Sequence, residues 1–94
     1  MPHHTAPVET VIGIDVSKAN VTIYATKTHR IHTVANTDSA IRSCLQAIGR
    51  HDLAVIEPTG GYELTVSRVL AALDQPTHRA DTLKVKAFMR SHGI

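Results

Sequence analysis

The stretch "VIGIDVSKANVTIYAT", residues 11–26, decides the fold. Two runs rich in β-branched residues, 11–16 and 21–25, are separated by the polar segment "SKAN", and this pattern predicts two strands joined by a turn. Asp15 stands inside the first run, where a buried carboxylate is costly unless something pairs with it. We therefore expect Asp15 either to end a strand and face water or to be held there for chemistry.

The rest of the chain alternates between strand and helix patterns. Period-two alternation and the helical spacing of apolar residues predict these elements, in chain order: a strand at 30–36, a helix at 37–50, a strand at 52–58, a helix at 59–74, a strand at 76–81 and a helix at 82–93. The order is βββαβαβα. Strands joined by short links pair antiparallel and strands separated by helices pair parallel. This order predicts an α/β fold with a mixed five-stranded sheet and flanking helices, the ribonuclease H-like arrangement, with the first and fourth strands adjacent at its centre.

Composition indicates one small globular domain. The chain has 94 residues, of which 43% are hydrophobic and 19% charged. We expect residues 1–10 to be a flexible leader and residues 11–94 to form the domain. No apolar run approaches the roughly 20 residues of a membrane span, and the first residues lack the pattern of a signal peptide, so we expect a cytoplasmic protein. The single cysteine, Cys44, falls among apolar helix positions and is expected to be a small core residue.

Two carboxylates are expected to meet at one edge of the sheet. Asp15 and Glu57 fall near the C-terminal ends of the first and fourth strands, which as parallel neighbours lie about 4.8 Å apart. Carboxylates this close repel unless a cation neutralises them, and Mg²⁺ is the hard ion that prefers oxygen ligands. The alternative stays open that Asp15 only starts a turn and that Glu57 is an ordinary edge carboxylate.

The segment "TGGYE", residues 59–63, is expected to open the second helix. Thr59 is a candidate N-cap, and the two glycines could offer backbone N–H groups to an anion, although capping alone also explains them. Tyr62 is expected to belong to the core. Glu63 is expected to stabilise the first helical turn by its charge.

Basic residues suggest a nucleic-acid interface. The net charge is +2, which permits contact with nucleic acid without demanding it. The candidates that could contact phosphate are Lys18, Arg79, Lys84, Lys86 and Arg90. A solvated helix face explains the late cluster equally simply, and turn formation explains the segment around Lys18.

Three blocks in the same order, "IGIDVSKANVTIYA", "VIEPTGGYE" and "LKVKAFMRSHG", resemble the N-terminal domain of the DEDD transposases of insertion sequences, the family that includes the Piv DNA invertases and has a RuvC-like fold. The resemblance runs from about Val11 to Ile94. It implies a DNA recombinase domain that uses Mg²⁺ or Mn²⁺, with Asp15 and Glu57 as its first two acidic ligands. It also implies DNA as a partner and a guide RNA in complete relatives. Loss of the helices that follow in the family would leave apolar surface bare, so we expect a homo-oligomer.

The same resemblance marks what this chain is expected to lack. In the family two further aspartates follow the last block, and a C-terminal domain supplies a catalytic serine. The chain ends at Ile94, before that segment, so we expect it to be inactive alone. Family members tend to have Asn-Pro where this chain has Ala80 and Asp81; Asp81 could substitute as a ligand or serve as the N-cap of the last helix.

Two other functions compete with the recombinase interpretation. A non-enzymatic fragment could bind nucleic acid or dimerise through the basic residues 79–90. An ATP-binding half of an actin-like protein or sugar kinase would also open with an Ile-Gly-Ile-Asp strand. In such proteins a Gly-Thr or Gly-Ser follows the aspartate, whereas here Val16 follows, and a β-branched residue lacks that backbone freedom.

Overall fold

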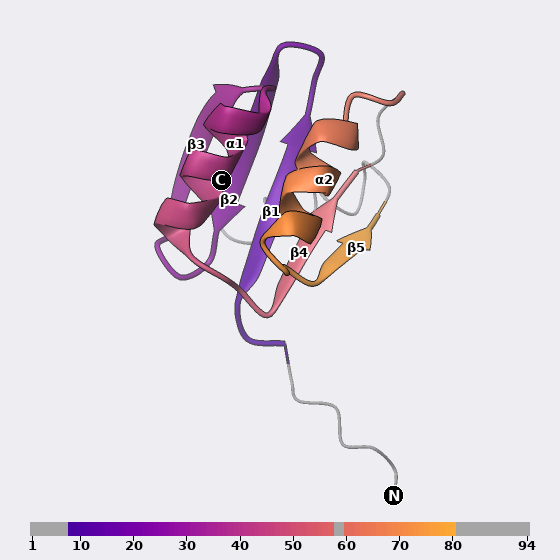
Figure 1. The fold of residues 1–94 in the computed structure, drawn as a ribbon. Helices are drawn as coiled ribbons and strands as arrows, with labels where there is room; N and C mark the ends of the chain where they lie inside the picture. The colour runs from indigo at the N-terminus through magenta and orange to yellow at the C-terminus, as the bar shows by residue number, and fades with distance from the viewer. Residues whose placement is uncertain (1–7, 58–59, 81–94) are drawn as a thin grey trace, which may run out of the picture.

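The computed structural model describes residues 8–57 and 60–80, which form one sheet with two helices (Figure 1). Its elements are β1 (Val11–Val16), β2 (Asn20–Ala25), β3 (Arg30–Ala35), α1 (Asp38–Ile48), β4 (Leu53–Ile56), α2 (Leu64–Ala72) and β5 (Thr77–Arg79). Every element predicted within this range is therefore confirmed in type and order. The helix expected at 82–93 and Asp81 lie outside the described residues.

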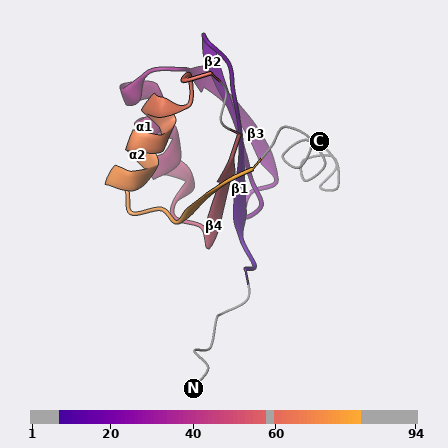
Figure 2. The same ribbon diagram turned by 90° about the vertical axis from the view of Figure 1, so that its right-hand side faces the viewer.

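The sheet has the predicted mixed topology. Its strand order is β3-β2-β1-β4-β5. The first three strands pair antiparallel, whereas β1 pairs parallel with β4 and β4 parallel with β5. Both described helices lie on the same face of the sheet (Figure 2). The chain therefore has an α/β fold of ribonuclease H-like topology, and β1 lies beside β4 at the centre.

The core fills the space between the sheet and the two helices. It takes alternate residues from each central strand, because successive side chains of a strand point to opposite faces. Its buried apolar side chains are Ile12, Ile14, Val16, Val21, Ile23, Ile41, Leu45, Ala54, Ile56, Val66, Val69 and Leu70. No helix of the described part of the chain is long and apolar enough to cross a membrane.

The ends of α1 follow the sequence signals. Thr37 is the N-cap, and its Oγ1 accepts a hydrogen bond from the Ala40 N–H at 3.3 Å. Gly49 is the C-cap, with a φ of 81° that disfavours other residues, and its N–H donates to the Leu45 carbonyl at 3.0 Å. The helix therefore begins and ends where capping chemistry predicts it.

Gln75 fastens the start of β5 to the loop before β4. Its Oε1 accepts a hydrogen bond from the His51 N–H at 2.9 Å, and its Nε2 donates to the His51 carbonyl at 2.9 Å and to the Pro76 carbonyl at 3.0 Å. Both side chains are buried, with exposed fractions of 2% for His51 and 8% for Gln75. One amide therefore satisfies both backbone groups of a buried residue far away in the sequence.

The described end of the predicted leader is attached to the same loop. Asp52 Oδ2 accepts hydrogen bonds from the N–H groups of Glu9 and Thr10, each at 3.0 Å. These bonds lower the pKa of the Asp52 carboxyl below its usual range. The chain is thus held in place immediately before it enters β1.

Candidate functional site

Asp15 lies inside β1 without entering the core. Its neighbours Ile14 and Val16 are both buried against the helices. Strand alternation therefore directs the Asp15 side chain to the opposite face of the sheet. There it is half-buried and stands across from Thr22 of β2. This position explains how an apolar strand carries a carboxylate without the cost of enclosing it in the core.

Glu57 follows β4 directly and continues the register with β1. The last pair of the parallel ladder is Ile14 with Ile56. One further step along each chain brings Asp15 opposite Glu57, at the separation of about 4.8 Å that neighbouring strands have. Glu57 is half-buried, like Asp15. The structure thus brings the two acidic residues predicted from the sequence to adjacent positions at the C-terminal ends of the neighbouring strands β1 and β4. Their role as metal ligands stays a prediction.

The carboxylates extend a row of oxygen-bearing side chains across four strands. Thr33 of β3 stands opposite Thr22 of β2, and Thr22 opposite Asp15. The two threonine hydroxyl oxygens are 3.4 Å apart. All donors of this row are oxygen atoms, which fit a hard cation such as Mg²⁺ or Mn²⁺. Among residues 8–57 and 60–80, no group of three or more His, Cys, Asp or Glu is placed to hold a metal ion.

The segment after Glu57 differs from its prediction. Gly60 and Gly61 have φ values of 56° and 92°, so the chain turns here and α2 begins only at Leu64. Thr59 lies outside the described residues, and Glu63 occupies the N-cap position without a side-chain capping bond. The expectation that Tyr62 belongs to the core is wrong. This side chain is 45% exposed because it precedes the helix whose inner face packs on the sheet.

Glu63 is buried and forms an ion pair with the exposed Arg79, which the sequence did not reveal. Its Oε2 lies 2.7 Å from Arg79 Nη2, and its Oε1 accepts a hydrogen bond from the Gly61 N–H at 3.0 Å. The side chain of Glu63 is 7% exposed and that of Arg79 is 58% exposed. The pair therefore connects the start of α2 to the end of β5, a larger role than the predicted charge effect on the first helical turn.

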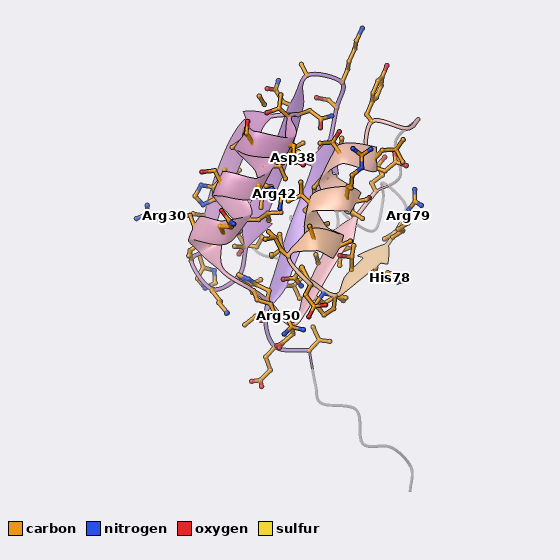
Figure 3. The ribbon with its side chains drawn as sticks, in the orientation of Figure 1. Arg30, Asp38, Arg42, Arg50, His78 and Arg79 are labelled. Carbon is orange, nitrogen blue, oxygen red and sulfur yellow. The ribbon has the colours of Figure 1, made fainter. Side chains whose placement is uncertain are left out.

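The predicted phosphate-binding residues are only partly within the described range. Lys18 is exposed in the turn between β1 and β2, shortly after Asp15. Arg79 stands opposite Ile56 in the register of β5 with β4. It lies on the edge strand β5, whereas Arg30 lies on the other edge strand, β3 (Figure 3). Lys18 thus follows the strand that carries Asp15, whereas Arg79 ends β5, the neighbour of β4. Lys84, Lys86 and Arg90 lie outside the described residues.

Cys44 is half-buried on α1, next to the core, as the sequence indicated. Burial raises the pKa of its thiol. The thiol is therefore protonated at neutral pH, which does not favour nucleophilic chemistry.

Comparison with known proteins does not extend this description. No model of a known protein family matches the chain. No curated protein matches it with significant similarity either. The likeness to DEDD transposases therefore remains a prediction from the sequence.

Proposed function

We propose that this chain is a catalytic-domain segment of a DNA transposase or recombinase, in which Asp15 and Glu57 hold a divalent metal ion. One observation supports the proposal: on a sheet of ribonuclease H-like topology, Asp15 and Glu57 each follow the last pair of the β1–β4 register, Ile14 with Ile56. Carboxylates kept in adjacent positions repel unless a cation is shared between them. A site of this kind gives a physical reason for both residues.

The described residues supply binding and orientation. A bound ion would neutralise the two carboxylates and stabilise charge on the leaving oxygen of a phosphodiester. Lys18, in the turn after β1, and Arg79, at the end of β5, would bind backbone phosphates of DNA near the C-terminal ends of these strands. A guanidinium has five N–H donors, so it can bind more than one group. Arg79 uses one Nη on Glu63 and keeps further N–H donors for a phosphate.

The position of Val16 supports this proposal over an ATP-binding one. Val16 is 4% exposed and belongs to the core cluster. The turn after β1 starts only at Ser17, so the residue after Asp15 is fixed as strand. A backbone approach to nucleotide phosphates at that residue would require it to leave the core.

The test is metal-dependent stabilisation. We expect Mn²⁺ or Mg²⁺ to raise the unfolding midpoint of the wild type, by about 2.7 kcal/mol of stability at an ion concentration 100 times the Kd. Asp15→Asn and Glu57→Gln should each abolish the rise. Asp74→Asn is the matched control, because Asp74 is exposed in a turn with a φ of 57°, a conformation that asparagine also adopts.

Two results would contradict the proposal: a wild type that no divalent ion stabilises, or a stabilisation that survives both carboxylate substitutions. DNA binding that weakens with salt and with Lys18→Ala, but without any metal effect, would instead favour the non-enzymatic nucleic-acid-binding alternative.

A further inference from the structure

Asn36, the residue after β3, joins the two segments that lead away from the candidate carboxylates. Its Nδ2 donates one hydrogen bond to the Ser17 carbonyl and one to the Tyr62 carbonyl, each at 3.0 Å. Ser17 is the first residue after β1, the strand that contains Asp15. Tyr62 lies in the segment that begins with Glu57. A single carboxamide therefore connects the chain on the Asp15 side with the chain on the Glu57 side.

The contacts of Asn36 define its orientation. Both partners are carbonyl oxygens, which only accept hydrogen bonds, so the nitrogen of the amide must face them. The Asn36 backbone N–H donates to the Ala19 carbonyl at 2.9 Å, which fixes the residue against the β1–β2 turn. Its Oδ1 is buried and finds no hydrogen-bond partner among the described residues. Few side chains could replace this one, because two donors on one atom at this short reach are particular to asparagine.

The Glu63–Arg79 pair holds the same segment from the other side. Arg79 stands opposite Ile56 in the β4–β5 register, next to the start of the segment 57–63. Its guanidinium then binds Glu63 at the end of that segment. Glu63 is thus joined to β5 by an ion pair, and Tyr62 is joined through Asn36 to the β1–β2 turn.

We propose that Asn36 is a positioning residue that fixes the separation between the carboxylates of Asp15 and Glu57. This inference rests on the proposed function for the reason that the separation matters, which is metal binding. The separation itself can be measured without metal. Groups that orient metal ligands from outside the first coordination sphere typically change metal affinity by about 10- to 100-fold. We expect Asn36→Ala to weaken Mn²⁺ binding by about 10-fold.

The experiment has two readouts. The first is the rate at which oxidised glutathione closes a disulfide between cysteines introduced by Asp15→Cys and Glu57→Cys, in a Cys44→Ser background. Neighbouring strands lie at a separation that a disulfide can span. The second is the Kd for Mn²⁺ of the chain with both carboxylates present. Each is measured in the protein with Asn36, in Asn36→Ala and in the control Asn20→Ala, at a temperature well below the unfolding midpoint of each protein.

Asn20 is a suitable control because it is exposed at the start of β2 and its side chain forms no hydrogen bond with the described residues. If Asn36→Ala does not fold, Asn36→Asp takes its place, since it keeps the size and removes both donors.

A slower disulfide closure and a weaker Mn²⁺ affinity, in Asn36→Ala but not in Asn20→Ala, would support the inference. Closure at the rate of the control would overturn it, whatever the metal does. Slower closure in a protein whose wild type shows no Asp15-dependent Mn²⁺ binding would support the positioning role and refute the metal site.

Discussion

Replacing Gln75 by leucine tests the structure where it depends most on a single polar side chain. Gln75→Leu keeps the volume of the side chain but removes its three hydrogen bonds to the carbonyls of His51 and Pro76 and to the N–H of His51. The Pro76 carbonyl keeps the Ala54 N–H as a donor at 2.8 Å. The N–H and carbonyl of His51 lose Gln75 and gain nothing.

The cost follows from the two groups left without Gln75. Each buried backbone group without a partner costs about 1–3 kcal/mol. Because Gln75 lies at the edge of the core and is 8% exposed, water will reach part of the site. We therefore expect a total loss of about 2–4 kcal/mol. At about 4–8 °C per kcal/mol for a chain of this size, the unfolding midpoint should fall by roughly 8–32 °C.

Urea unfolding followed by circular dichroism measures this loss. Gln46→Leu is the control, since Gln46 is exposed on α1 and a surface change of this kind stays within about 0.5 kcal/mol. Gln75→Glu should be intermediate, because it keeps an acceptor for the His51 N–H and loses the donor to the His51 carbonyl. A Gln75→Leu protein as stable as the control would refute the reasoning.

Three further predictions concern the core, a cap and a buried histidine. Ile14→Ala should cost about 2–5 kcal/mol in urea unfolding, because Ile14 is 0% exposed at the sheet centre; a loss under 1 kcal/mol would contradict the described packing. Thr37→Ala should cost about 1 kcal/mol through the lost N-cap of α1, whereas Ser39→Ala should not. Burial lowers the pKa of His51, so the unfolded chain takes up a proton more readily; stability should be fully present above about pH 6.5 and should fall as the pH drops below it. Thermal melts from pH 7.5 to 5 should show this loss in the wild type and a smaller one in His51→Gln; equal slopes would exclude His51 as its source.

Local patterns in the sequence were sufficient for the elements and their order. β-branched runs define β1 and β2, and the spacing of Ile41, Leu45 and Ile48 defines the inner face of α1. Sheet order followed from connection lengths, because a helix between two strands forces a parallel crossover. The neighbouring positions of Asp15 and Glu57 came from the same argument. These are cases in which nearby residues decide the structure.

Contacts between distant residues could not be predicted in this way. Nothing near Glu63 in the sequence indicates that Arg79 will neutralise it, and nothing near Gln75 indicates a buried partner in His51. Tyr62 was misplaced because its helical spacing continues that of α2, while the glycines before it delay the start of the helix. Polar side chains choose partners that the fold brings near, and a periodic pattern contains no information on that choice.

The same distinction applies to Asp15 and Glu57 at the C-terminal ends of β1 and β4. Alternation along β1 explains why Asp15 avoids the core, and the parallel register of β1 with β4 brings Glu57 to the neighbouring position. Neither explains why two acids should be kept adjacent, since a single Asn or Thr at either position would satisfy the strand equally well and remove the repulsion. Two contacts lie close to these segments in the chain: Asn36 donates to the carbonyls of Ser17 and Tyr62, and Glu63 pairs with Arg79. If the metal-dependent stabilisation expected above is found, a shared cation, rather than the requirements of the fold, is the reason that two acids occupy neighbouring positions.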